Sequence, residues 1–152
     1  MLTNPEIVKI THAGDNDYRL MHANYGIIPQ NVFDTQLASG FIGYKYPISF
    51  RKLVEAELDV YLSKGYAVAD WEGRPFKTKQ LKYALNDVVP LPKLWQNLKT
   101  KLEEKSRVEW AKEEFSMFEL EDFYKKEQHK EALGSNLMRA LNPKEKVFLI
   151  QL

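Results

Sequence analysis

The sequence predicts an α/β fold in which two parallel strands are followed by a mostly helical C-terminal half. Two observations indicate this fold. Residues 6–44 read in the order strand, helix, strand, helix, which is typical of parallel strands joined by crossover connections. Beyond them, the segments at 49–58, 77–89 and 93–128 repeat apolar residues at the three- and four-residue spacing of helices.

The first strand and helix lie close to the start of the chain. The strand is predicted over the β-branched run 7–11, which a glycine turn follows. The helix is predicted over 15–26, with Asp15 as its N-cap and Gly26 as the residue that stops it.

The second strand is predicted over 30–35, and Asp34 is placed to cap the helix that follows at 35–44. Ser49 is in the same position before the helix predicted over 49–58. These local caps complete the α/β part of the prediction.

The middle of the chain is predicted to be a loop between helices. Residues 61–76 mix Gly, Pro and aromatic residues without a regular period, which indicates an ordered loop. The helix at 77–89 should end before Pro90 and Pro92, because a proline removes a backbone donor and crowds the preceding turn. Residues 93–128 predict one long amphipathic helix or two.

The last residues predict a helix at 142–152, with Asn142 as cap and Pro143 at the first helical position. This helix reaches the end of the chain without a C-cap, and two strands are too few for an independent sheet. The expectation is therefore a chain that is cut at both ends and is marginally stable, aggregation-prone or dependent on a partner.

Composition excludes several classes of protein. The chain has 152 residues, is 44% hydrophobic and 28% charged, and has no cysteine. It therefore has no disulfide, zinc–thiolate site or thiol nucleophile, and it has neither a secretory signal nor a membrane span, which points to the cytoplasm. The net charge of +1 lacks the strong basic excess of many nucleic-acid-binding proteins, although it does not exclude a nuclease.

The helix at 77–89 has two different faces. Its apolar face is expected to pack; this face comprises Leu81, Ala84, Leu85 and Val88. The other face brings together Gln80, Tyr83 and Asp87. A phenol and a carboxylate one turn apart are consistent with ordinary surface residues or with part of an active site.

Four motifs in order resemble one known family. They are "KITHAGDNDYRLM", "NVFDTQLASGF", "DWEGRPF" and "QLKYALNDV", and they run from about Glu6 to Val88. The series resembles ribonuclease D and related 3′-5′ exonucleases of the DEDDy type, which have a ribonuclease-H-like fold. The resemblance implies a partial fold of this kind, with weaker likeness continuing through "RVEWAKEE" and "LNPKEKVFLIQL".

The resemblance also implies the site. In the family, four carboxylates hold two divalent ions about 3.5–4 Å apart, which activate a water for phosphodiester hydrolysis. The matching residues here are Asp17, after "HAG", and Asp87, at the end of the Tyr-x-x-x-Asp motif. Tyr83 would orient the attacking water. Carboxylate oxygens suit Mg²⁺ or Mn²⁺.

The family's first motif, an Asp-x-Glu pair on a strand, has no counterpart before Asp17, where the only acids are Glu6 and Asp15. The chain is therefore expected to be a fragment that begins after this motif. We expect it to hydrolyse RNA very slowly or not at all by itself.

Each candidate also has an ordinary structural explanation. Asp17 would otherwise complement the helix dipole, and Tyr83 with Asp87 would be an exposed helical pair. Asp34 is explained as an N-cap and is not taken as a metal ligand. His12 is interpreted as a packed or hydrogen-bonded histidine, since two-metal chemistry needs no imidazole.

The loop and the start of the next helix offer candidate substrate-binding residues. Lys64, Arg74 and Trp71 could contact phosphate or stack on a base, or else Trp71 fills the core while the two cations stay solvated. Gln80 is a supporting candidate because it shares the face of Tyr83.

The resulting expectation is a 3′-5′ exoribonuclease of the ribonuclease D type that acts on RNA with a free 3′ end. Its expected parts are a partial exonuclease domain at 1–105, a helical linker at 106–140, and the start of a helical nucleic-acid-binding domain at 141–152. The alternatives are a non-catalytic nucleic-acid-binding remnant and one half of a split nuclease, with the Asp-x-Glu strand on a separate chain.

Overall fold

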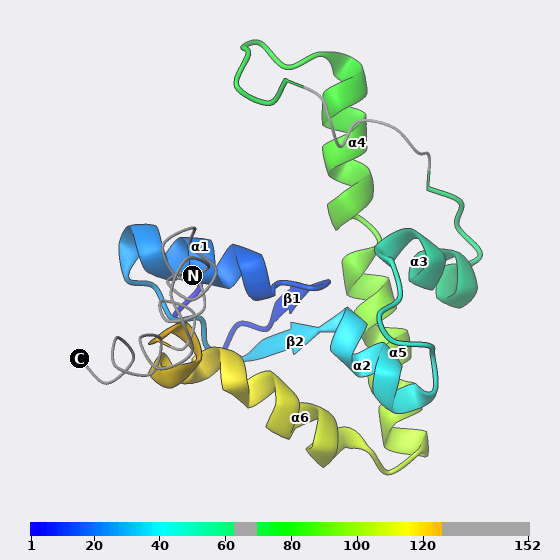
Figure 1. Cartoon of the computed structure of the whole chain (residues 1–152). Coiled ribbons are helices and arrows are strands. Elements are labelled where there is room, and N and C mark those ends of the chain that lie inside the picture. The colour runs from blue at the N-terminus through cyan, green and yellow to red at the C-terminus, as the bar shows by residue number, and fades with distance from the viewer. Residues whose placement is uncertain (63–69, 126–152) are drawn as a thin grey trace, which may run out of the picture.

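The computed structural model describes residues 1–62 and 70–125. Two short parallel strands and a set of helices form the described chain (Figure 1). The elements are β1 (Lys9–Thr11), α1 (Asp15–Tyr25), β2 (Val32–Asp34), α2 (Thr35–Ile42), α3 (Phe50–Leu58), α4 (Thr78–Val88), α5 (Leu91–Glu104), α6 (Val108–Ser116) and the 3₁₀ turn η1 (Met117–Glu119). The α/β prediction with two parallel strands is confirmed.

The two strands pair in parallel, with Ile10 opposite Phe33. They are shorter than the sequence predicted, at three residues each. Helix α1 connects them and lies on one side of the sheet, whereas α6 lies on the other (Figure 1). This crossover brings the ends of β1 and β2 side by side, and the turns after the two strands therefore meet.

The caps follow the sequence in most places. Asp34 caps α2 as predicted, because its Oδ1 accepts hydrogen bonds from the backbone N–H groups of Gln36 and Leu37 at 2.8 and 3.1 Å. Gly26 ends α1 in the left-handed conformation, at φ 64°. The prediction that Asp15 caps α1 is wrong: Gly14 occupies the N-cap position, and Asp15 is the first helical residue.

The main core lies between α2, α3, α5 and α6, against β2. Its members are Phe33, Ala38, Ile42, Leu53, Val54, Leu94, Leu98, Leu102, Ala111 and Phe115. A second cluster joins α1 and β2 to the segment after α6, and it comprises Tyr18, Val32, Phe118 and Tyr124. Residues 93–128 are predicted as one or two helices; within the described part they form most of α5, then α6 and η1. Ser106, between α5 and α6, has φ 55°.

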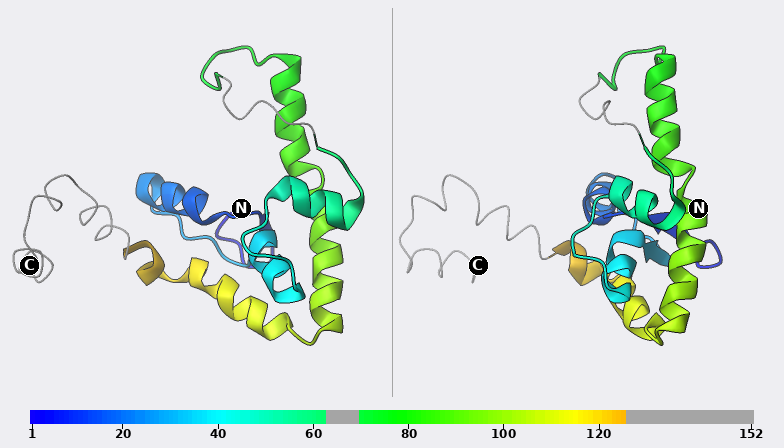
Figure 2. Two further views of the ribbon diagram at one scale, coloured as in Figure 1. Left: turned by 45° about the vertical axis from the view of Figure 1, so that its right-hand side comes forward. Right: turned by 90° about the vertical axis from the view of Figure 1, so that its right-hand side faces the viewer.

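Helix α4 extends away from this core. It ends at Val88, and α5 begins at Leu91 after Pro90, so the predicted break before the prolines is confirmed. Both views in Figure 2 show α4 rising beyond the other helices, roughly in line with α5. The predicted packing of its apolar face is wrong in this structure, because Leu81, Leu85 and Val88 are exposed. We call residues 70–88 the α4 arm.

The helix predicted at 142–152 and the boundaries at 140 and 141 lie outside the described residues. Within residues 1–62 and 70–125, no helix is long and apolar enough to cross a membrane.

Candidate functional site

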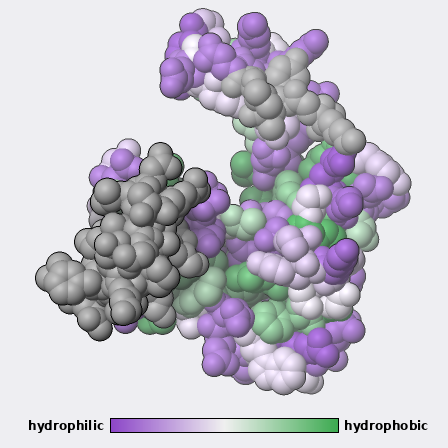
Figure 3. Space-filling model, viewed as in Figure 1, coloured by the Kyte–Doolittle hydropathy of each residue, from purple (hydrophilic) through white to green (hydrophobic). Residues whose placement is uncertain are grey.

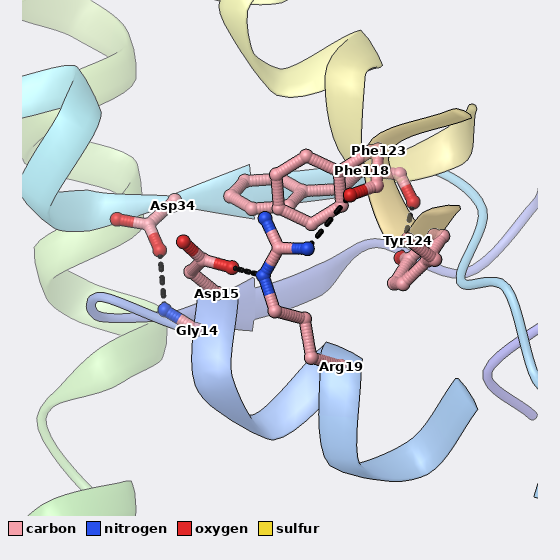
Figure 4. A network of polar contacts seen from close by, with 7 residues as sticks. All are labelled: Gly14, Asp15, Arg19, Asp34, Phe118, Phe123 and Tyr124. Carbon is pink, nitrogen blue, oxygen red and sulfur yellow. Dashed lines mark hydrogen bonds and ion pairs between the residues drawn. The ribbon is translucent and has the colours of Figure 1, made fainter. Parts of the chain in front are cut away.

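The turn between β1 and α1 is held by a buried carboxylate. Asp34 is 1% exposed, and its Oδ2 accepts a hydrogen bond from the backbone N–H of Gly14 at 2.8 Å (Figure 4). The hydroxyl of Thr11 donates to the same oxygen at 3.4 Å. Since Oδ1 already caps α2, both oxygens are committed to donors within the protein. The interpretation of Asp34 as a structural cap is thereby confirmed.

Glycine is required in this turn by the lack of space. A Cβ at Gly14 would lie 2.7 Å from the Thr11 hydroxyl oxygen and 3.0 Å from Cε2 of Tyr18. Both are side chains held by other contacts: the Tyr18 hydroxyl donates to Thr11 Oγ1 at 3.2 Å. Burial raises the pKa of Tyr18 to about 12, so the phenol remains neutral and acts as a donor. The start of α1 is therefore fixed relative to β1 and β2.

His12 connects the same turn to the segment before α3. Its Nδ1 lies 3.0 Å from the hydroxyl of Thr35, and its Nε2 lies 3.0 Å from the carbonyl oxygen of Ile48. Its ring also meets the edge of Phe50. Burial lowers the pKa of His12, against a smaller opposing effect of the Asp34 charge. The prediction of a hydrogen-bonded histidine is confirmed.

Asp17 lies in the first turn of α1 and is exposed to solvent. The helix that carries it is tied to the far end of the described chain by Arg19. The Arg19 guanidinium pairs with Asp15 at 2.5 Å, donates to the carbonyl oxygen of Phe123 at 2.7 Å, and lies 3.8 Å from the centre of the Phe123 ring (Figure 4). Asp17 is therefore an exposed carboxylate on an anchored helix.

The sequence reasoning did not find the role of Arg19. The i,i+4 spacing of Asp15 and Arg19 on a helix could have indicated the ion pair. The contact with Phe123, 104 residues later, has no local signal in the sequence.

The second group of candidates lies on the α4 arm. Gln80 is 6% exposed; its Oε1 accepts from the backbone N–H of Lys77 at 2.8 Å, and its Nε2 donates to the carbonyl oxygen of Asp70 at 2.6 Å. Both ends of this amide are thus used to hold the loop against the helix. The Tyr83 ring lies 6.1 Å from the ring of Trp71, centre to centre. Asp87 follows one turn later, and partial burial raises its pKa.

The loop residues pack on the arm itself. Nη1 of Arg74 donates to three carbonyl oxygens in turn, those of residues 71, 72 and 73, and the guanidinium lies 3.8 Å from the centre of the Phe76 ring. Trp71 contacts Phe76 and Tyr83 and belongs to neither core cluster. Lys64 lies outside the described residues.

The structure thus places the three candidate catalytic residues on two elements. Tyr83 and Asp87 share one face of α4, whereas Asp17 is on α1. The first turn of α1 and the last turn of α4 lie on the same side of the sheet (Figures 1 and 2). Across the described ranges, no three His, Asp or Glu side chains are arranged to hold a metal ion. Two carboxylates of the right chemistry are present, but they do not by themselves fit a two-metal centre.

Comparison with known proteins identifies the family to which the chain belongs. A sequence model of 3′-5′ exonuclease domains matches residues 1–103. Ribonuclease D of Bartonella henselae is 35% identical over 117 residues, which cover 77% of this chain and 29% of that protein. Ribonuclease D of a Shewanella species is 37% identical over 115 residues, with 75% and 29% covered.

Solved structures agree with the sequence comparison. Escherichia coli RNase D, described as an exoribonuclease involved in structured RNA processing, superposes with a TM-score of 0.73 at 30% identity, over 78% of this chain and 32% of that one. Brucella melitensis NrnC gives a TM-score of 0.71 at 31% identity, over 78% and 58%. The fold is therefore that of the RNase D and NrnC exonucleases. The chain belongs to the 3′-5′ exonuclease family, and it spans about 30% of the length of the curated relatives it matches.

Proposed function

We propose that this chain is part of a ribonuclease-D-type 3′-5′ exoribonuclease that acts on RNA with a free 3′ end. The observation that carries the proposal is the family match over residues 1–103. This range contains Asp17, Tyr83 and Asp87, which the resemblance of the sequence motifs assigns to the site. Tyr83 and Asp87 lie one turn apart on α4, and this spacing would let both reach one ligand.

In the proposed site, Asp17 and Asp87 contribute carboxylates toward divalent ions, Mg²⁺ or Mn²⁺. A neighbouring structure of NrnC contains bound Mg²⁺. When bound, such ions supply an activated water and stabilise the leaving oxygen of the phosphodiester. Tyr83 would orient that water through its hydroxyl. Gln80 would act by holding the loop and helix together, and Arg74 and Lys64 would contact the substrate.

Two carboxylates leave half of the charge of a pair of divalent ions uncompensated, so we propose that the chain alone is a weak or inactive nuclease. The proposed division is an exonuclease part at 1–105, a helical linker at 106–140 and the start of a helical domain at 141–152. The alternative of a split nuclease, completed by a separate chain with an Asp-x-Glu strand, is favoured by one observation. In the parallel pairing of β1 with β2, the N–H and C=O of Ile10 point away from β2, toward an edge of β1 that pairs with no other strand within the described residues.

Metal binding and hydrolysis test this proposal separately. Mn²⁺ titration of the full chain should show weak binding that Asp17→Asn and Asp87→Asn each reduce about tenfold or more. Asp59→Asn is the matched control, since Asp59 is an exposed acid that ends α3. With Mn²⁺ and a 5′-labelled RNA, the full chain should give little or no 3′ trimming.

Robust turnover by the chain alone would contradict the proposed inactivity. Equal Mn²⁺ binding by Asp17→Asn, Asp87→Asn and the control would contradict the metal assignment. Activity gained on adding a second polypeptide with the Asp-x-Glu strand would identify a split nuclease, whereas RNA binding without any cleavage would identify a non-catalytic remnant.

A further inference from the structure

The end of the α4 arm is rich in basic side chains, which lie beside the acids Asp70 and Glu72 of its loop. Four exposed cations lie within nine residues of one another: Arg74, Lys77, Lys79 and Lys82. None of them has a carboxylate within ion-pair distance in the described part of the chain. We call these four residues the arm cations. Figure 3 shows that hydrophilic residues cover this end of the molecule.

Some basic residues in the body form ion pairs with neighbouring carboxylates. Lys101 lies 2.7 Å from Glu57, Lys112 lies 2.8 Å from Glu109, and Lys125 lies 3.3 Å from Glu121. Other exposed lysines of the body, such as Lys45, Lys52 and Lys105, also lack an ion pair within the described residues, but they are far apart in the sequence, whereas the four arm cations lie within nine residues. The first turn of α4 contains no acidic residue that would offset them. Like charges this close repel one another unless an anion lies between them.

One of the arm cations, Lys79, lies on the face of α4 that carries the candidate site, and Lys82 lies beside it. Lys79 and Tyr83 are four residues apart, so they project from one side of α4, and Lys82, three residues after Lys79, lies at the flank of this side. Asp87 lies one turn further along the same side. At 1.5 Å per residue, Lys82 is about 7.5 Å and Lys79 about 12 Å from Asp87 along the helix axis.

The loop that supports this face is held by its own contacts. The Arg74 guanidinium is fixed by three carbonyl oxygens and the Phe76 ring, and Gln80 joins the loop to the helix. Trp71 lies between Phe76 and Tyr83. The arm therefore offers aromatic rings beside cations, which is the combination that tracks single-stranded nucleic acid.

We propose that the arm cations bind the phosphate backbone of single-stranded RNA, several nucleotides before the 3′ end that lies at Asp87. This inference rests on the proposed function for the identity of the nucleic acid. Because Lys79 is about 12 Å from Asp87 along the axis, a dinucleotide at the site is too short to reach all the arm cations. The arm is thus a binding site for longer RNA, separate from the carboxylates.

The test measures RNA binding by fluorescence anisotropy, with the full chain in EDTA so that neither metal nor cleavage contributes. The probe is a fluorescein-labelled single-stranded RNA of about ten nucleotides, which is long enough to follow the arm. The variant Lys77→Gln/Lys79→Gln/Lys82→Gln should weaken binding about tenfold or more. It should also lower the slope of log K against log salt by about 2, for three lost phosphate contacts on a single strand.

The matched control is Lys45→Gln/Lys52→Gln/Lys105→Gln, which removes the same charge from exposed lysines outside the arm. It should change the affinity less than about twofold, because long-range charge effects are screened by salt. A labelled dinucleotide should bind equally to the wild type and to the arm variant. Thermal melts of both triple variants should match the wild type, since all six lysines are exposed.

Several results would overturn the inference. They are failure of the wild type to bind the RNA, equal loss in the two triple variants, and equal competition by poly-glutamate, which would indicate an acidic protein as the partner. None of these depends on metal or cleavage, so the Mn²⁺ titration of Asp17 and Asp87 variants still decides the proposed function independently.

Discussion

The turn region and the α4 arm differ in how far their side chains are buried and hydrogen-bonded. In the turn region, formed by β1, α1, β2 and α2, buried and half-buried polar side chains hold the elements together: Asp34 accepts four hydrogen bonds, and His12 uses both ring nitrogens. The arm has one well-buried polar side chain, Gln80, while its apolar residues and its cations face solvent. One candidate carboxylate lies on each region.

The two candidate carboxylates, Asp17 and Asp87, are therefore held in place in different ways. Asp17 is placed by tertiary contacts from several elements. Asp87 is placed by the direction of a helix whose nearest strong anchor is α5, through the buried Leu94, Leu98 and Leu102. Residues with few buried apolar contacts open locally at lower free energy than core residues. We therefore expect the arm to exchange its amide hydrogens faster than the turn region.

The largest effect on stability should come from a substitution in α5, the helix that follows the arm. Leu98 is 0% exposed, whereas Leu85 in α4 is 59% exposed. Leu98→Ala should lower the free energy of unfolding by about 2–5 kcal/mol, because it leaves a cavity in the core. Leu85→Ala should change it by no more than about 0.5 kcal/mol. Urea unfolding measures both, and similar losses would show that the apolar face of α4 is covered in solution.

A smaller effect on stability should follow from substitution of Asp34, whose carboxylate joins the turn after β1 to the start of α2. Asp34→Ala removes an acceptor of four hydrogen bonds and leaves the buried N–H of Gly14 unpaired, at a cost of about 2–4 kcal/mol. Asp34→Asn keeps one oxygen that can cap α2 and should cost roughly half as much. Equal losses in the two variants, by thermal unfolding, would indicate that the cap contributes nothing and that the contact with Gly14 carries the whole effect.

The smallest effect is on the pH dependence of the free energy of unfolding. Burial lowers the pKa of His12 in the folded protein below its ordinary value of 6.5, so the unfolded chain binds the proton more readily. The contribution of neutral His12 to the free energy of unfolding is fully present above pH 6.5. It is lost as the pH falls through the lower pKa of the folded protein. His12→Gln should therefore flatten the loss of unfolding free energy between roughly pH 7.5 and pH 5. An unchanged slope in the variant would contradict this assignment.

The sequence predicted those parts of the molecule that local chemistry decides. The crossover pattern, the Asp34 cap, the Gly26 stop and the break before Pro90 all depend on a few neighbouring residues, and all are confirmed. The N-cap of α1 was wrong because a glycine turn, supported from β2, displaced the better capping residue Asp15 by one position.

The rest depends on tertiary contacts that have no local signal. Helical periodicity identified the apolar face of α4 but could not show whether another element covers it, and Leu81, Leu85 and Val88 are left exposed by the elements that the structure describes. The roles of Asp17, Tyr83 and Asp87 came from the ordered motifs and remain predictions. The contact between Arg19 and Phe123 joins residues too far apart in sequence for any pattern to reveal.

That contact makes the far end of the described chain a tether for α1. Asp17 is two residues from Arg19 on the same helix, so a pull on the backbone at Phe123 is transmitted through one guanidinium to the turn that holds a candidate ligand.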